Sequence, residues 1–230
     1  MEYELRIVAF NRPEYLRHVV NALVQVRGLE KYRIVASVDG SITGGYEPDV
    51  LKILRGLTRD IRCRSRLGCN AHLRLNWLEA SRGNADRIFI LEDDLCLARS
   101  ALEFCENNDA LLSQSAKSIC PYCAPFIEDR PERTRDGWRW SLAGFIANSW
   151  FTPWGVYLSR ETASQISGLW PSEWDNAEQT WDQLLHYEVM QVNRFLQINP
   201  LVTRVRNIGA FGTHMHGGCR IHTLTSDDVE

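Results

Sequence analysis

Three consecutive carboxylates, Glu92, Asp93 and Asp94, directly follow an apolar run that ends at Leu91. Carboxylates this close together disfavour joint ionisation unless a cation or several hydrogen-bond donors offset their charge. A hard divalent ion such as Mg²⁺ or Mn²⁺ would do so, because it takes oxygen ligands and can bridge a carboxylate to a phosphate. The alternative is a solvated acidic turn that caps a helix at residues 95–104, and we favour the functional interpretation.

Short apolar runs that alternate with amphipathic ones predict the elements that hold these acids. Strands are expected at residues 5–10, 33–38, 61–64 and 86–91, and helices at residues 49–57 and 70–80. A further helix is expected to begin with Asn11 as its N-cap and Pro13 in its first turn, with Glu14 completing a capping box, and to end at Gly28. This alternation predicts an α/β fold with a mostly parallel, twisted sheet flanked by helices.

The second half of the chain has a less regular pattern. A polar, charged stretch at residues 127–140 predicts a loop. Strands are expected at residues 154–158 and 196–205, and helices at residues 161–166 and 179–195. Neither an internal repeat nor a linker divides the sequence, so residues 1–230 are expected to form a single domain.

Polar residues follow three of the predicted strands at the point where each strand ends. They are the segment 10–12, Asp39 with Gly40, and the acidic triplet 92–94. Open α/β sheets bind their ligands beyond the carboxyl ends of the strands, so these residues are expected to converge on one edge. Asp39 could accept hydrogen bonds there from a ribose or a base, although an ordinary Asp-Gly turn explains it equally well.

Composition and charge exclude several functional classes. The formal net charge is −3 with 24% charged residues, so no electrostatic footprint for nucleic acid is expected. No stretch approaches the roughly 18 apolar residues of a membrane span, and the chain opens without an export signal, which favours a cytoplasmic protein. Cys120 and Cys123 have the spacing of half a zinc site, but no second pair accompanies them, so the seven cysteines are interpreted as free thiols.

Several segments, taken in order, resemble glycosyltransferases with the GT-A fold. In the first half they are IVAFNRPEYL (7–16), SVDG (37–40), RLGCNAH (66–72) and FILEDDL (89–95). In the second half they are WFTPWG (150–155), TWD (180–182), NPLVTRVRNIG (199–209) and the pair TH (213–214). The set is similar in particular to the N-acetylglucosaminyltransferase I family and to related small bacterial enzymes. The resemblance implies a Rossmann-like nucleotide-binding half, about 1–110, and an acceptor-binding half, about 111–222.

The resemblance also implies which residues bind the nucleotide. Those that would hold the base and ribose, or lie near the nucleotide, are Phe10, Asn11, Arg12, Asp39, Arg66 and His72. For His72 a second interpretation stays open, because a single histidine on a helix is often a packed or surface residue. Glu92 would point toward the ribose and Asp93 toward the donor sugar.

The metal and the catalytic base follow from the same resemblance. Asp94 would be the ligand of a Mn²⁺ or Mg²⁺ ion, and His214 would touch the metal or the diphosphate. His216 could take the place of His214, or both could be solvated. Asp182 falls where the family places its catalytic base. An acid in the first turn of a helix would also suit the helix dipole without any catalytic role.

The function implied is transfer of a hexosyl or N-acetylhexosaminyl group from a nucleotide diphosphate donor, such as a UDP-sugar, to an acceptor hydroxyl. The reaction would invert the anomeric centre, and the acceptor would be a glycan, a peptide or a small molecule. One alternative is another metal-dependent phosphate-handling enzyme, such as a nucleotidyltransferase; another is a non-catalytic nucleotide- or sugar-binding module. The tryptophans of the second half include candidates for a platform that packs on the apolar face of a sugar.

Overall fold

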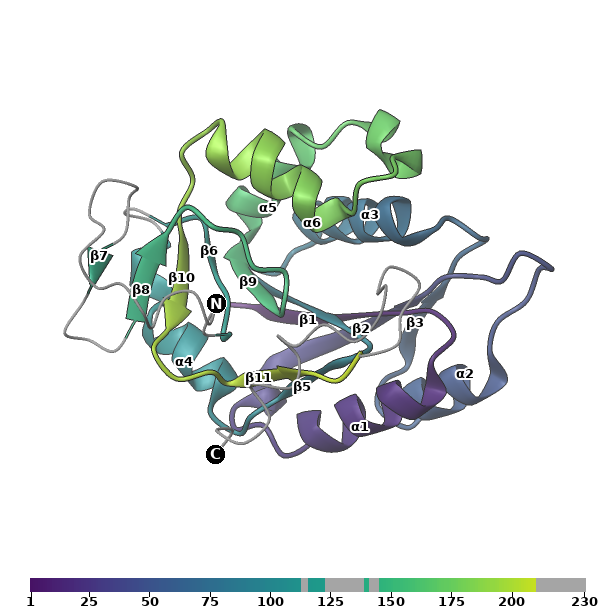
Figure 1. Ribbon diagram of the computed structural model, residues 1–230. Coiled ribbons are helices and arrows are strands. Elements are labelled where there is room, and N and C mark those ends of the chain that lie inside the picture. The colour runs from purple at the N-terminus through teal and green to yellow at the C-terminus, as the bar shows by residue number, and fades with distance from the viewer. Residues whose placement is uncertain (113–115, 123–138, 141–144, 210–230) are drawn as a thin grey trace.

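Nine strands form one sheet through the middle of the molecule in the computed structural model (Figure 1), which describes residues 1–112, 116–122, 139–140 and 145–209. In order across the sheet they are β3 (Asp60–Cys63), β2 (Tyr32–Val38), β1 (Tyr3–Ala9), β4 (Arg87–Glu92), β9 (Val156–Ser159), β6 (Ser118–Ile119), β10 (Gln197–Pro200), β8 (Phe145–Asn148) and β7 (Arg139–Trp140). The first four are parallel to one another, β9 and β8 run in the opposite direction, and β6 and β10 return to the first direction. The predicted mostly parallel sheet is therefore confirmed.

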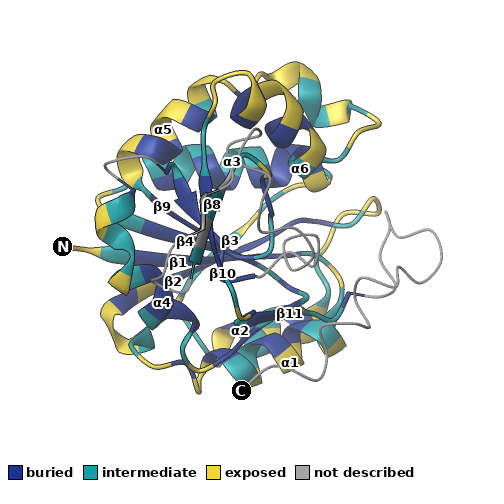
Figure 2. Cartoon of the chain, turned by 60° about the vertical axis from the view of Figure 1, so that its left-hand side comes forward, coloured by how far each residue is buried: buried dark blue, intermediate teal, exposed yellow. Residues whose placement is uncertain are grey.

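Helices cover both faces of this sheet (Figure 2). On one face lie α1 (Pro13–Leu23), α2 (Pro48–Arg55) and α4 (Ala101–Asn107); on the other lie α3 (Cys69–Ser81), α5 (Arg160–Gly168) and α6 (Trp181–Leu184). Short helical turns complete the path: η1 (Leu29–Lys31), η2 (Asp109–Leu111), η4 (Ser172–Asn176) and the π-helix η5 (Leu185–Gln191). Two further strands, β5 (Leu95–Leu97) and β11 (Val205–Asn207), pair antiparallel in a small second sheet.

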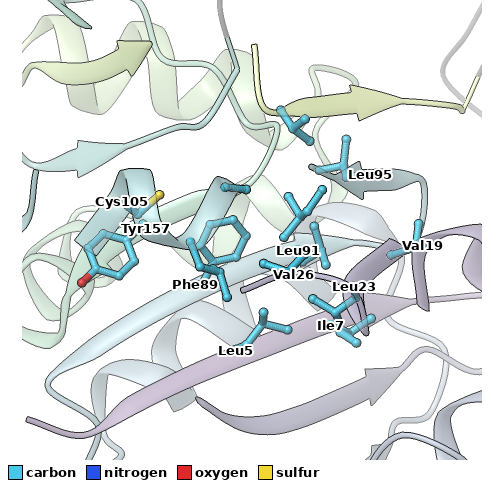
Figure 3. Packing of buried hydrophobic residues seen from close by; sticks show 14 of the residues in the cluster. Leu5, Ile7, Val19, Leu23, Val26, Phe89, Leu91, Leu95, Cys105 and Tyr157 are labelled. Carbon is cyan, nitrogen blue, oxygen red and sulfur yellow. The ribbon is translucent and has the colours of Figure 1, made fainter. Parts of the chain in front are cut away.

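Side chains of successive strand residues alternate between two hydrophobic cores, one on each side of the sheet. Leu5, Ile7 and Leu91 pack against α1 (Figure 3), whereas Val8 and Ile90 pack against the face covered by α3. The strands are buried on both faces, which is why their sequences are almost continuously apolar rather than alternating. Among the described residues, no helix combines the length and the apolarity needed to cross a bilayer.

Several predicted boundaries are corrected by the structure. Arg12, not Asn11, directly precedes the first residue of α1, and no side chain caps that end; the helix ends at Leu23, five residues before Gly28. The proline at the first helical position supplies a preset backbone angle and needs no N–H partner, so the helix begins without a capping box. Residues 95–104 do not form one helix, because the first three pair with β11 and α4 starts only at Ala101.

The second half follows the predicted pattern more loosely. The predicted helix at 179–195 begins at Trp181, continues as the π-helix η5 and ends at Gln191. The predicted strand at 196–205 is two strands, β10 and β11, which belong to different sheets. Most of the predicted loop at 127–140 lies outside the described residues.

Candidate active site

A cavity of about 400 Å³ opens at the carboxyl ends of β1, β2 and β4. It brings together every predicted site residue except His214, which lies outside the described residues. The predicted residues in its wall are Phe10, Asn11, Arg12, Asp39, Arg66, His72, Glu92, Asp93, Asp94 and Asp182. Parallel strands place their carboxyl ends on one edge, so residues that are distant in sequence meet here. The individual roles of these residues stay predictions.

Arg12 offsets part of the charge of the acidic triplet. Its guanidinium forms an ion pair with Asp93, and its Nη1 lies 2.9 Å from Oδ2 of Asp94. Asp93 is buried and also accepts a hydrogen bond from the backbone N–H of Phe10 at 3.0 Å. Burial raises the pKa of the Asp93 carboxyl to about 6, although Arg12 opposes that rise. Asp93 therefore ties the end of β1 to the end of β4.

Replacing Arg12 with Met should destabilise the fold more at pH 8 than at pH 5. Folding raises the pKa of Asp93 from its ordinary value to about 6. Protonated Asp93 therefore adds stability that is fully present below the pKa of the unfolded chain. This stability is lost as the pH rises through about 6. Without Arg12 the ionised form at pH 8 loses its cation, and we expect a loss of about 1.5–3 kcal/mol. Urea unfolding at the two pH values measures it. Arg17→Met, at an exposed position of α1, is the control; equal losses at both pH values would contradict the pairing.

Three other carboxylates lie near Glu92 in the cavity wall. Burial raises its pKa well above the ordinary value, and the negative charges of Asp94, Asp182 and Asp93 raise it further. The pocket therefore carries more negative charge than Arg12 alone compensates. Within the described part of the chain, no group of three or more His, Cys, Asp and Glu side chains is arranged to hold a metal ion by itself.

The carboxylate of Asp39 shapes the loop that leads into α3. Its Oδ1 accepts hydrogen bonds from the backbone N–H groups of Gly40 and Leu67 at 3.0 and 2.8 Å, and its Oδ2 accepts one from Gly68 at 2.9 Å. A Cβ at Gly40 would come within 2.9 Å of the backbone oxygen of Arg64, the residue after β3, so a larger residue does not fit there. Asp39 thus positions the first turn of α3 at the cavity, whether or not it also binds a ribose.

Arg66 and Phe10 form a stacked pair at one side of the cavity. The guanidinium carbon of Arg66 lies 4.5 Å from the centre of the Phe10 ring, and its Nη1 is 4.0 Å from Oδ2 of Asp39. A cation held over an aromatic face is attracted by the ring, and both groups are planar. Both residues line the cavity, so the pair contributes an aromatic and a cationic group to its wall.

His72 is buried one turn into α3 and is held by a polar partner. Its Nε2 lies 2.7 Å from Oγ of Ser37 on β2. Burial, aided by the positive charge of Arg64, lowers the pKa of His72 to about 4. The imidazole is therefore neutral at pH 7, which favours a hydrogen-bonding role over an electrostatic one.

The imidazole of His72 should not titrate between pH 5.5 and 8, because its folded pKa lies near 4. Long-range ¹H–¹⁵N correlation spectra of ¹⁵N-labelled protein would show constant ring nitrogen shifts for this residue across that range. His18, which is exposed on α1, provides the internal comparison. Movement of the His72 nitrogens with a midpoint near 6.5 would contradict burial of a neutral ring.

Asp182 is positioned by the buried residue before it. Trp181 stacks on Trp170 with ring centres 6.0 Å apart and packs near Trp77 of α3 and Phe151, at 6.5 and 5.9 Å. This aromatic cluster fixes the start of α6 on the face of α3. With Trp181 turned into the core, the carboxylate of the next residue, Asp182, reaches the cavity wall.

Polar contacts from α3 hold the segment that enters α6. Nδ2 of Asn70 donates hydrogen bonds to the backbone oxygens of Trp174 and Gln179, both at 3.0 Å. Arg74 makes two hydrogen bonds of 2.6 Å to the carboxylate of Asp175. A paired arginine and carboxylate of this kind fix orientation as well as distance. Helix α3 therefore holds in place the segment that leads to Asp182.

The structure also adds residues that the sequence analysis did not name individually as site residues, although all except Leu73 lie in the segments that carry the resemblance. They are Val8, Ala9, Cys69, Leu73, Trp154, Asn207 and Gly209. Asn207 and Gly209 lie at the cavity because β11 pairs with β5, the strand that directly follows the triplet. The backbone N–H of Ile208 donates to the backbone oxygen of Asp94 at 2.9 Å, and a Cβ at Gly209 would overlap the Asp94 carboxylate. Such pairing between distant segments leaves no local pattern in the sequence.

No protein-family model matches this chain, and no curated protein sequence matches it significantly. Among solved structures, a cytidylyltransferase from Leptospira borgpetersenii superposes with a TM-score of 0.52 and 11% identity, over 85% of this chain and 74% of that one. S. aureus TarS, residues 1–349, superposes with a TM-score of 0.53 and 12% identity, over 87% of this chain and 60% of that one.

The galactosyltransferase LgtC, solved with donor and acceptor sugar analogues, superposes with a TM-score of 0.45 and 12% identity, over 80% of this chain and 70% of that one. We draw nothing from this weaker likeness. At such low identities the matches concern the fold, and the particular resemblance to the N-acetylglucosaminyltransferase I family stays a prediction. The protein has a GT-A-like α/β fold, which it shares with the cytidylyltransferase and with TarS.

Proposed function

We propose that this protein transfers a sugar from a nucleotide diphosphate donor to an acceptor hydroxyl. The observation that carries the proposal is the meeting of Asp39, the acidic triplet and Asp182 around one cavity at the carboxyl ends of parallel strands. Its volume of about 400 Å³ is in the range of small-molecule sites. Its lining combines an aromatic ring and two arginines with several carboxylates, which would suit a nucleotide joined to a sugar.

The nucleotide would lie along β1 and the first turn of α3. The planar surface of Phe10 and Arg66 suits a base, with Asp39 beside it as an acceptor for ribose hydroxyls. Helix α3 begins at Cys69 in the cavity wall, and the positive end of a helix dipole favours the negative diphosphate there. We propose a UDP-sugar as the donor, with the ribose near Glu92.

The donor set fits a divalent ion. Mg²⁺ and Mn²⁺ are commonly held by one or two carboxylates together with phosphate oxygens of the substrate, and need no closed cage of protein ligands. Asp94 would provide the protein ligand, and the unbalanced negative charge around Glu92 favours an added cation. When bound, the ion would offset the charge that the departing diphosphate gains.

Asp182 would act as the base. Its carboxylate would accept the proton of the acceptor hydroxyl while the oxygen bonds to the anomeric carbon and the bond to the diphosphate breaks. Attack from the face opposite the leaving group inverts the anomeric centre. Arg12, which already lies between Asp93 and Asp94, would bring a second positive charge to the phosphates.

A panel of nucleotide sugars with Mn²⁺ tests the proposal. Thermal shift and slow hydrolysis of the donor would identify the preferred nucleotide and sugar before any acceptor is known. We expect one UDP-sugar to stabilise the protein and to be hydrolysed slowly, and excess chelator to abolish both effects. Turnover that persists in excess chelator would remove the metal from the proposal, and failure of every nucleotide sugar to bind would overturn the function.

A nucleotidyltransferase is the second candidate, because the fold is shared with a cytidylyltransferase. Release of pyrophosphate from CTP or UTP in the presence of sugar phosphates would favour it over sugar transfer. Calorimetric binding of a nucleotide without turnover, over the whole panel of donors and acceptors, would instead indicate a binding module.

A further inference from the structure

Two half-exposed aromatic rings flank one buried histidine outside the cavity. Trp150 and Tyr187 are 47% and 52% exposed, whereas His186 is 3% exposed. The ring of His186 lies with its centre 4.2 Å from that of Trp150 and 4.6 Å from that of Tyr187. Surface aromatic residues that gather in this way are a common feature of binding sites.

The histidine between them is held rigidly. Its Nδ1 accepts a hydrogen bond from the backbone N–H of Phe151 at 3.2 Å, and its Nε2 lies 3.1 Å from Nε2 of Gln191. Burial lowers the pKa of His186, so the ring is neutral at pH 7. A fixed, uncharged ring behind them limits how far the two exposed rings can turn, so little conformational entropy is lost on binding.

Two chain segments connect this aromatic pair to the cavity. On the helical side, His186 follows Asp182 by one turn, and the charge of Asp182 acts on the histidine. On the other side, the segment 150–154 runs from Trp150 to Trp154, which lines the cavity. Gln197 holds Thr152, in the middle of this segment, through two hydrogen bonds. Oε1 of Gln197 accepts from the backbone N–H of Thr152 at 2.7 Å, and Nε2 of Gln197 donates to the backbone oxygen of Thr152 at 3.1 Å.

We propose that Trp150 and Tyr187 form a platform for a sugar ring of a carbohydrate acceptor. This inference rests on the proposed function, because it takes Asp182 as the base that faces the reacting hydroxyl. Indole and phenol rings combine an apolar face with a polar edge, which matches a pyranose with its C–H faces and hydroxyl rim. Exposed Glu188 beside Tyr187 disfavours an anionic acceptor, so the platform suits a neutral sugar.

Saturation-transfer NMR with neutral tetrasaccharides tests the platform on the 230-residue protein. The probes are cellotetraose, chitotetraose and maltotetraose, and the dissociation constant of UDP with Mn²⁺ is measured in parallel. We expect at least one probe to bind, and Trp150→Ala and Tyr187→Ala each to weaken it about three- to tenfold. UDP binding should stay unchanged in both variants. Trp150→Phe, which keeps an aromatic face, should recover most of the binding.

The control is Val24→Ala, which removes an exposed apolar side chain at the end of α1. Thermal melting of every variant checks that the fold is intact. If no probe binds, or if both alanine variants bind as the wild type does, the platform is overturned. If a probe binds through these rings while no nucleotide binds, the platform stands and the proposed transferase function fails, so the two failures are distinguishable.

Discussion

Asn in place of Asp182 is expected to slow sugar transfer about 10²–10⁴-fold, the usual contribution of a general base, while nucleotide binding stays at the wild-type level. An amide has nearly the same shape as the carboxylate but cannot accept the acceptor's proton. Asp182 is only partly buried, and Trp181 supplies the anchorage of α6, so the helix should keep its place. The loss should therefore appear in kcat rather than in the dissociation constant of the donor.

The experiment compares single-turnover rates and donor dissociation constants of the wild type, Asp182→Asn and Glu178→Gln. Glu178 is an exposed acid just before α6, and its replacement removes the same charge without reaching the cavity. If Asp182 served only the helix dipole, Asn would lower stability by about 0.3–1 kcal/mol and leave the rate intact. Full transfer activity in Asp182→Asn would therefore end its assignment as the base.

The parts of the site that were predictable lie at the ends of strands. β1, β2 and β4 have dense apolar runs, so their boundaries and the polar residues after them were predicted to within a few positions. Parallel pairing then dictates that Asn11, Asp39 and the triplet meet at one edge. The convergence of these residues follows from the direction of the strands and the right-handed crossover alone.

The parts that were not predictable depend on contacts between distant segments. Arg12 was expected to bind the nucleotide, and nothing in the sequence indicated that it pairs with Asp93 and Asp94. Likewise, β11 follows β10 closely in sequence but pairs with β5 in another sheet, which brings Gly209 against Asp94. Pairing of short strands is decided by tertiary packing rather than by local pattern, so a periodicity argument merged the two strands into one.

Helix α3 rests on a partly buried ionic cluster that the sequence pattern also did not indicate. Glu79 accepts hydrogen bonds from Arg62 at 2.6 Å and Arg6 at 3.3 Å, and it pairs with Arg64 as well. Arg6 is 1% exposed and makes a second ion pair with Glu4. Glu79 therefore joins α3 to the strands β1 and β3 beneath it, and its replacement leaves several arginines without their shared anion.

Glu79→Gln is expected to reduce the free energy of unfolding by about 1.5–3 kcal/mol at pH 7, because the neutral amide loses the hydrogen bonds that the carboxylate accepts from charged arginines. Burial acts to raise the pKa of Glu79, but the hydrogen bonds and charges of the arginines overcome it and lower the pKa. The stabilisation is therefore present above the unfolded pKa of about 4.3 and is lost as the pH falls through the lower folded value. The difference between wild type and variant should shrink in acid.

Urea unfolding from pH 7 down to pH 3 measures both the size and the pH dependence of this effect. Glu103→Gln is the matched control, since Glu103 pairs with Arg27 at 2.7 Å on the surface, where such a pair contributes about 0–1 kcal/mol. Because α3 carries His72 and the turn beside Asp39, the weakened anchorage should also lower affinity for the nucleotide. Equal losses in the two variants would show that the cluster under α3 behaves as solvated surface, and the helix would then owe its position to Trp77 and its apolar neighbours.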